Sequence, residues 1–299
     1  MRAMMFATAH SFFRQQLVAW WQRLSGSSVA PLAPAIPVDL WQRVLEKHPF
    51  VQQLTIPEQA GVQHLAAAFL GSKEFTGGNG LLITDEIALT IAVQAVLPLL
   101  YLGRPGEKFP ARRWKPGHAL TWYDDFVGIV VHPGPVMAQR TQTDAAGVVH
   151  HYGEALAGEA MQGGPVTLSW QDVASASTQA DVGYNLVIHE FAHKLDMQDG
   201  VADGCPPLPP QFAGTRGPRS ARKHWDTVMQ AAYVQLCDQL SLAERFGAEP
   251  PWLNSYGATH ISEFFAVACE AYFVNRTRLA KDFAPLVVLL DAFFRPVGR

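Results

Sequence analysis

The stretch that most constrains this chain is His189-Glu190-Phe191-Ala192-His193. On a helix, residues four apart lie on the same face, so His189 and His193 can direct two imidazoles at one metal ion. Glu190 lies about 100° further round the helix, so it reaches a water beside the metal more easily than the metal itself. This spacing is typical of zinc hydrolases, in which the glutamate accepts a proton from that water.

The residues around this motif favour a helix, which the metal-binding hypothesis requires. Asp181 is a candidate N-terminal cap, and Asp199-Gly200 is a suitable end. Lys194 comes near the end of the expected helix, where a positive charge is favoured. The alternative is a buried helix with two structural histidines. That alternative is weaker, because burying a glutamate beside two histidines costs free energy unless its carboxylate has a polar partner or function.

A catalytic zinc usually takes three protein ligands and a water, so a third ligand is expected outside the motif. In the extended pattern H-E-x-x-H-x-x-G-x-x-H, this chain has Asp196 in place of the glycine and Asp199 in place of the third histidine. Asp199 stays open as a ligand by spacing, although the turn back to the metal is harder without the glycine. Asp196 shares a helix face with His193 and is a candidate for holding a ligand imidazole.

A second expected helix, Ile261–Val274, offers the favoured third ligand. Glu263 and Glu270 are seven residues apart and share one face of this otherwise apolar helix. Two carboxylates on a buried face need positive partners, and a zinc ion supplies one. We therefore expect Glu263 to bind the metal and Glu270 to hold the free N–H of a ligand imidazole.

Tyr256 is a candidate for stabilising negative charge during a reaction. It lies seven residues before Glu263, in a Ser-Tyr-Gly turn. A phenol at that position can donate a hydrogen bond to the oxyanion of a tetrahedral intermediate. A tyrosine that only packs against its neighbours is an equally good reading of the sequence.

The composition limits the partners and the compartment. The 299 residues carry a net charge of −3 and only 16% charged residues, so direct nucleic-acid binding is not expected. The three cysteines, Cys205, Cys237 and Cys269, form neither a C-x-x-C pair nor an even-numbered disulfide framework. This pattern favours a reducing compartment, and we expect the cytoplasm.

The sequence divides into an N-terminal segment, residues 1–37, and a larger unit, residues 38–299. The first is expected to form an amphipathic helix (Met1–Leu24) followed by a linker rich in Ser, Ala and Pro. No apolar run in it is long enough to span a bilayer. Docking of this helix on the body of the protein is favoured over binding to a membrane surface or a partner.

Hydrophobic periodicity predicts helices on both sides of a cluster of strands. Helices are expected at residues 38–47, 57–70, 84–102, 223–246, 261–274 and 279–294, and strands at 120–123, 126–131, 148–155 and 166–170. This order predicts an α+β fold with one mixed or antiparallel sheet. Strand 166–170 is expected to precede the metal helix by one loop and to offer its edge to an extended peptide.

Three stretches carry a family resemblance: GGPVTLSWQDV (163–173), GYNLVIHEFAHKLD (183–196) and SYGATHISEFFAVACEAYF (255–273). Trp225, and the helical stretches LWQRVL and TIPEQAGVQHLAAAFL nearer the N-terminus, fit the same pattern. Through these residues the chain resembles the Mlc titration factor A (MtfA) family of zinc peptidases, over roughly residues 38–295.

The resemblance implies a gluzincin-like site in which His189, His193 and Glu263 bind zinc, Glu190 is the motif glutamate and Tyr256 is the active-site tyrosine. It implies a zincin-like metallopeptidase core with a mixed sheet, an HExxH helix and a second helix that carries the Glu ligand. It also implies aminopeptidase-like activity in the cytoplasm. The implied partner is the glucose-regulatory repressor Mlc, through which such a protein would regulate sugar uptake.

Two functions are compatible with these residues. The first is a zinc-dependent metallopeptidase that hydrolyses peptide bonds, and the intact Glu190 favours it. The second is a regulatory binding protein that sequesters a transcription factor and has little or no peptidase activity. A fourth protein ligand that closes the metal site would favour the second function, because a catalytic site keeps one position open.

Overall fold

The computed structural model describes residues 35–103, 116–143, 149–156 and 158–295. The expected N-terminal amphipathic helix and most of the linker lie outside these residues, so the division of the chain at residue 37 stays a prediction. None of the helices in the described part is both long enough and apolar enough to cross a bilayer.

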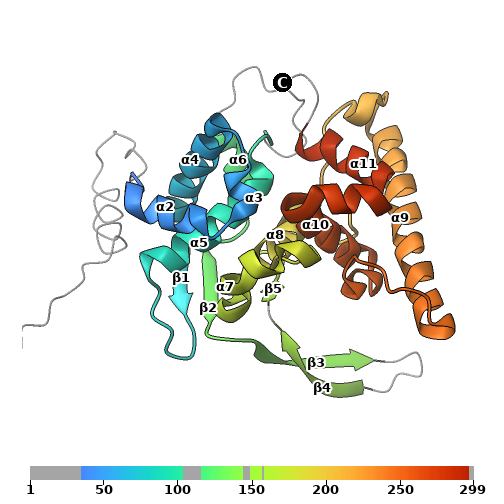
Figure 1. Ribbon diagram of the computed structural model, residues 1–299, viewed down its shortest axis with the longest axis horizontal. Helices are drawn as coiled ribbons and strands as arrows, with labels where there is room; N and C mark the ends of the chain where they lie inside the picture. The colour runs from blue at the N-terminus through green and yellow to red at the C-terminus, as the bar shows by residue number, and fades with distance from the viewer. Residues whose placement is uncertain (1–34, 104–115, 144–148, 157, 296–299) are drawn as a thin grey trace, which may run out of the picture.

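Helices make up most of the described chain and flank a small sheet (Figure 1). Those in the N-terminal half are α2 (Val38–Glu46), α3 (Pro49–Gln52), α4 (Ile56–Ser72), α5 (Asp85–Val96) and α6 (Pro116–Ala119). Those in the C-terminal half are α7 (Trp170–Gln179), α8 (Leu186–Asp196), α9 (Pro218–Phe246), α10 (Ile261–Asp282) and α11 (Ala284–Phe294). The fold is therefore α+β, as predicted. The two last predicted helices are confirmed, but their boundary lies at Phe283.

The main sheet is mixed and has the strand order β1-β2-β6-β5. Its members are β1 (Glu74–Gly77), β2 (Gly128–His132), β5 (Gly158–Ala160) and β6 (Val166–Ser169). β2 runs parallel to both β1 and β6, whereas β5 pairs antiparallel with β6 and ends the sheet. In β2 and β6, Ile129, Val131, Val166 and Leu168 are fully buried, so one face of the sheet belongs to the core.

A separate antiparallel hairpin interrupts the chain between β2 and β5. Its strands are β3 (Val136–Thr143) and β4 (Val149–Leu156), with Val136 opposite Leu156. The hairpin extends away from the body of the molecule, below the sheet in the view of Figure 1. Since β4 ends at Leu156 and β5 begins at Gly158, the hairpin is joined almost directly to the edge of the main sheet.

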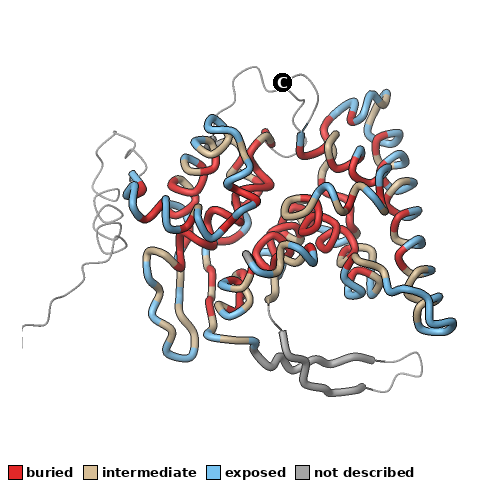
Figure 2. The backbone as a smooth tube through the Cα atoms, viewed as in Figure 1, coloured by how far each residue is buried: buried red, intermediate tan, exposed pale blue. Residues whose placement is uncertain are grey.

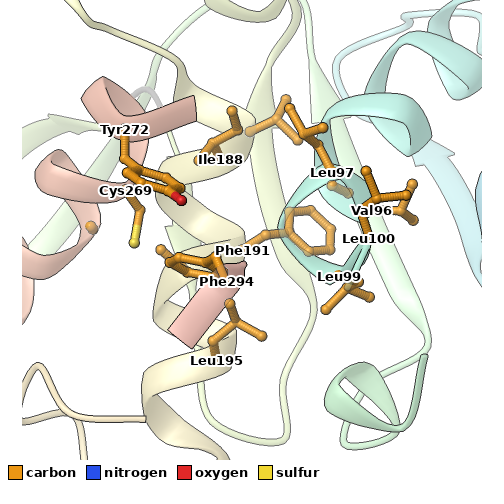
Figure 3. Packing of buried hydrophobic residues seen from close by; sticks show 14 of the residues in the cluster. Val96, Leu97, Leu99, Leu100, Ile188, Phe191, Leu195, Cys269, Tyr272 and Phe294 are labelled. Atoms are coloured by element: carbon orange, nitrogen blue, oxygen red, sulfur yellow. The ribbon is translucent and has the colours of Figure 1, made fainter. Parts of the chain in front are cut away.

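Helix α8, which carries the HEFAH motif, lies at the centre of the molecule. Its apolar residues Ile188, Phe191 and Leu195 are fully buried and recur at the spacing of one helix face. Figure 3 shows this face between α10 and α11 on one side and the end of α5 on the other. Buried residues are concentrated where α4, α5, α8 and α10 meet (Figure 2). The motif is thus held by two packed surfaces.

The predicted strand at 120–123 is wrong, because residues Leu120–Tyr123 form a 3-10 turn, η2. The aromatic residues that suggested a strand are instead donors of buried hydrogen bonds to main-chain carbonyls. The Trp122 indole donates to the carbonyl of Gly103 at 2.8 Å, and the Tyr123 hydroxyl donates to the carbonyl of Ala95 at 2.9 Å. Tertiary contacts, not strand pairing, therefore determine this segment.

The expected role of strand 166–170 also needs correction. Its strand character is confirmed in β6, but β6 lies between β2 and β5, so its edges are paired and the sheet edge is β5. Trp170 starts an unpredicted helix, α7, which stands between β6 and the metal helix. The Ser169 hydroxyl caps α7 by accepting from the Asp172 amide at 3.4 Å. Ser169 is a typical N-cap residue, so the sequence does carry a local signal for the start of this helix.

We expect the core around Trp225 to be a main source of stability. The Trp225 ring is fully buried, its Nε1 donates to the Gly204 carbonyl at 2.8 Å, and it contacts Phe212, Phe265 and Phe293. Trp225→Ala should lower the free energy of unfolding by about 3–5 kcal/mol, through a cavity and a lost hydrogen bond.

The control is Leu242→Ala on the same helix, because Leu242 is 49% exposed. This change should alter the free energy of unfolding by less than about 0.5 kcal/mol. Urea unfolding followed by circular dichroism measures both variants. Equal losses in the two variants would contradict the assignment of the core to this ring.

Candidate metal centre

A buried series of hydrogen bonds from α5 fixes the start of α8. Asn185 is the N-terminal cap: its Oδ1 accepts from the Ile188 amide at 2.9 Å. Its Nδ2 donates to Oε1 of Gln94 at 2.7 Å, and Gln94 in turn donates to the Thr90 carbonyl at 2.9 Å. Asp181, the predicted cap, lies instead in the preceding turn η3 (Ala180–Val182). The side chains on the first turn of α8 therefore start from a fixed backbone.

The structure brings His189, His193 and Glu263 together. Nε2 of His189 and Nε2 of His193 are 3.2 Å apart, and each lies 3.1 Å from Oε2 of Glu263. The histidines come from consecutive turns of α8 and the glutamate from the first turn of α10. No fourth His, Cys, Asp or Glu of the described residues joins this group of donor atoms.

The three donor atoms fit a tetrahedral zinc ion. With zinc bonds of about 2.0–2.1 Å, neighbouring ligand atoms of a tetrahedron are about 3.3–3.4 Å apart. The observed separations of 3.1–3.2 Å are close to that value. Two imidazoles and one carboxylate are also a common catalytic zinc set, which leaves the fourth position open. Side chains from two helices could thus supply three corners of a metal site.

Glu270 fixes the orientation of the first histidine. Its Oε1 lies 2.7 Å from Nδ1 of His189, and its Oε2 accepts from the Asn185 amide at 2.5 Å. The Glu270 side chain is 1% exposed. When the imidazole is neutral, a carboxylate at Nδ1 keeps the ring proton on that nitrogen, and the lone pair of Nε2 is then available to a metal on the side of Glu263 and His193. This is the contact expected of Glu270 from its spacing to Glu263.

Without a metal, the charges of this cluster resemble an ion pair. Burial opposes a charge on His189, but hydrogen bonds with Glu263 and Glu270 outweigh it and raise the imidazole pKa well above its usual range. Burial would raise the pKa of Glu263, yet the two histidines lower it far below its usual range. Both shifts report one attraction between a cation and a carboxylate, and a metal cation would take the place of the imidazolium proton.

Glu190 lies beside the metal group in a nearly closed environment. It is 4% exposed, and burial raises the pKa of its carboxyl to about 8, with Glu263 and Glu270 adding to the effect. The backbone of the edge strand runs against it: a methyl group at Gly158 would lie 2.4 Å from its Oε1. A carboxyl with a pKa near neutrality is suited to accept and return a proton.

Tyr256 stands at the rim of this site. It lies in the turn η6 (Ser255–Ala258), is 44% exposed, and its ring centre is 5.9 Å from that of His189. The phenol therefore lies on the solvent side of the first histidine, where a substrate would approach.

The two aspartates after the motif lie outside the metal group. Asp199 is exposed, and its Oδ1 accepts from the Val201 amide at 3.2 Å. Asp196 is fully buried, and its Oδ2 accepts from the Gly204 amide at 2.9 Å. Asp196 therefore ties α8 to the following loop, whereas Glu270, the other candidate, contacts the imidazole of His189.

The structure adds residues that the sequence analysis overlooked. Both polar residues could have been recognised from the sequence: Asn185 directly precedes the apolar run of α8, and Gln94 is a polar residue inside the apolar run 84–102. Gly158 and the internal contacts of Lys194 could not, because they depend on how the edge strand lies against α8.

In the metal-free protein, stability should fall as pH rises from about 5 to about 8. Burial raises the carboxyl pKa of Glu190 to about 8 and that of Asp196 to about 7, from ordinary values of 4.5 and 3.8. The folded state then holds more protons than the unfolded state across this interval, and this stabilisation is lost as pH rises through the folded pKa values. His189, with its raised pKa, acts with the same sign.

Thermal unfolding of chelated protein at the two ends of this pH range measures the effect. The midpoint should be lower at the alkaline end, and Glu190→Gln should reduce the difference because the amide does not titrate. A midpoint that rises with pH in the chelated wild type would contradict the burial of these carboxyls.

The sequence matches known proteins over nearly its whole length. The model of the family described as glucose-regulated metallo-peptidase M90 matches residues 19–295. The Mlc titration factor A of Klebsiella pneumoniae is 30% identical over 263 residues, which cover 87% of this chain and 87% of that protein.

Further relatives agree with this match. The Mlc titration factor A of Serratia proteamaculans is 29% identical over 262 residues, 87% of this chain and 88% of that protein. A Synechocystis protein described as uncharacterized is 30% identical over 256 residues, 85% of this chain and 82% of that protein. The chain therefore belongs to the glucose-regulated metallo-peptidase M90 family, together with the Mlc titration factor A proteins.

Proposed function

We propose that this metallopeptidase is zinc-dependent and hydrolyses peptide bonds at the site formed by α8 and α10. The observation that carries the proposal is the convergence of His189, His193 and Glu263 next to the buried carboxyl of Glu190. Because no fourth His, Cys, Asp or Glu of the described residues joins the group, the donor set fits a catalytic metal better than a structural one. In this proposal the core is zincin-like and the ligand set is that of the gluzincins.

Each residue of the proposed site has one task. Zinc, when held by the two histidines and Glu263, supplies an acidic water and polarises a carbonyl. Glu190 accepts the proton of the attacking water and delivers it to the leaving amine. Tyr256 donates to the developing oxyanion from the rim of the site. Glu270 keeps the His189 ring oriented through Nδ1.

The edge strand β5 is the proposed docking line for the peptide. Among the described strands β5 pairs with β6 alone, so its other edge offers main-chain groups to an extended substrate. β5 comprises three residues, Gly158–Ala160, and Gly158 lies against Glu190. A short edge beside the proton acceptor holds only a short stretch of substrate, which supports aminopeptidase-like removal of N-terminal residues.

A regulatory partner is part of the proposal through the relatives. Proteins named Mlc titration factor A share about 30% identity with this chain over most of both sequences. We propose a transcriptional repressor of the Mlc type as a binding partner and the cytoplasm as the compartment. The three cysteines, which are free thiols, support a reducing environment.

Glu190→Gln should abolish most of the peptidase activity while leaving zinc bound. The amide keeps the size of the side chain but cannot accept the proton, so kcat should fall on the order of 10²–10⁴-fold. The measurement is hydrolysis of unblocked peptides at equal zinc content, with Glu244→Gln, an exposed residue of α9, as the matched control.

Removal of zinc by a chelator should likewise stop hydrolysis, and added zinc should restore it. Undiminished cleavage by Glu190→Gln or by chelated protein would contradict the enzyme assignment and favour the binding protein. Cleavage of N-terminally blocked peptides at the same rate would contradict the aminopeptidase-like preference alone.

A further inference from the structure

Lys194 is a buried cation that the proposed reaction does not use. It follows His193 directly, and its side chain is 0% exposed. Its Nζ donates to Oδ2 of Asp125 at 3.0 Å, to the Met161 carbonyl at 2.6 Å and to the Gly164 carbonyl at 3.1 Å. The three donors of the ammonium are thus all used inside the protein. The two carbonyls belong to the turn between β5 and β6.

Asp125 holds the same turn from a second direction. Its Oδ2, which accepts from Lys194, also accepts from the Gly163 amide at 3.3 Å. Asp125 lies just before β2, the strand that pairs with β6. The turn Met161–Gly164 is therefore joined by one ion pair to both the metal helix and the middle of the sheet.

The same face of α8 contacts both ends of the edge strand. Glu190 and Lys194 are four residues apart on the helix, so their side chains leave the same face one turn apart. Glu190 lies against Gly158 at the start of β5, and Lys194 binds the Met161 carbonyl just after its end. The spacing of β5 from the metal helix is thus defined at two points.

The edge strand itself is only half-buried. None of the residues from Gly158 to Gly164 is buried, and the strand reaches the core through the partly buried side chain of Ala160. The strand also pairs over three residues with β6, and the Gly164 amide donates to the Met161 carbonyl at 3.1 Å. A short, half-buried strand at a sheet edge opens more easily than a core strand, so polar contacts that hold it matter.

We propose that Lys194, together with Asp125, is a positioning residue that fixes the edge strand β5 at the distance from Glu190 and the metal ligands that a bound peptide needs. This inference rests on the proposed function for its catalytic consequence, but not for its structural one. Lys194 touches neither substrate nor metal in this account. It acts through the Met161–Gly164 turn.

Lys73 provides a matched control. It is also a buried lysine whose Nζ donates to main-chain carbonyls, those of Tyr123 and Phe126. Both lysines lie over the Phe126 ring, Lys73 at 4.0 Å and Lys194 at 4.5 Å from its centre. Only Lys194 is bonded to the turn after β5. Lys73→Met and Lys194→Met therefore remove similar interactions and differ in the tie to the edge strand.

Amide hydrogen exchange of the zinc-loaded chain tests the structural step. Lys194→Met should speed exchange of the amides at 158–164 relative to wild type, whereas Lys73→Met should leave them unchanged. At equal zinc content, Lys194→Met should lower kcat/KM for peptides on the order of 100-fold, because a displacement of about 1 Å is enough for such a loss. Lys73→Met should keep the wild-type kcat/KM.

Binding of two hydroxamates separates the strand from the metal. A peptide hydroxamate should lose about tenfold in affinity in Lys194→Met, as for one lost hydrogen bond, because its chain lies along β5. Acetohydroxamate, which reaches only the metal, should bind as in wild type. Equal loss for both compounds, or unchanged exchange at 158–164, would overturn the proposal.

If Lys194→Met does not fold, Asp125→Asn provides a second test of the same proposal. Asp125 is partly exposed, and the amide preserves its shape while it weakens both hydrogen bonds to Oδ2. It should increase exchange at Gly163 and weaken the peptide hydroxamate but not acetohydroxamate; an unchanged Gly163 amide would overturn the proposal. A wild type that cleaves no peptide would refute the proposed function, while the exchange comparison would still decide the role of Lys194.

Discussion

The carboxylate of Glu270 is the contact on which the arrangement of the two central helices depends. The side chain is buried. One of its oxygens is hydrogen-bonded to Nδ1 of His189, and the other accepts a hydrogen bond from the backbone amide of Asn185, the cap of α8. A buried carboxylate is costly unless it is paired, so α8 and α10 must meet in the one register that satisfies it. That register brings Glu263, seven residues earlier on α10, to the two histidines.

Helix α8 has three faces, and each has a separate task. The face with Ile188, Phe191 and Leu195 fixes the helix in the core. The face with His189 and His193 meets Glu263. The face with Glu190 and Lys194 meets the edge strand. Because successive residues turn by about 100°, one short segment can serve packing, metal binding and substrate positioning.

The sequence predicted the parts of this site that depend on helical spacing. The HEFAH motif and the pair Glu263 and Glu270 are local patterns, and the structure brings them into contact as expected. The edge strand could not be predicted, because Gly158–Ala160 is three residues long and its place depends on pairing with β6. The sequence predicts Lys194 only as a helix-end cation, whereas its partners come from segments some 30 and 70 residues away. Leu120–Tyr123 was misread because aromatic residues also anchor turns.

Metal analysis is the most direct test of a zinc site built from three ligands on two helices. Zinc should be measured by elemental analysis in the wild type, in Glu263→Ala and in Asp199→Ala, after dialysis against the same low zinc concentration. We expect about one zinc per chain in the wild type and in Asp199→Ala, and a large loss of zinc in Glu263→Ala. Full zinc content in Glu263→Ala, or its loss in Asp199→Ala, would contradict the ligand set.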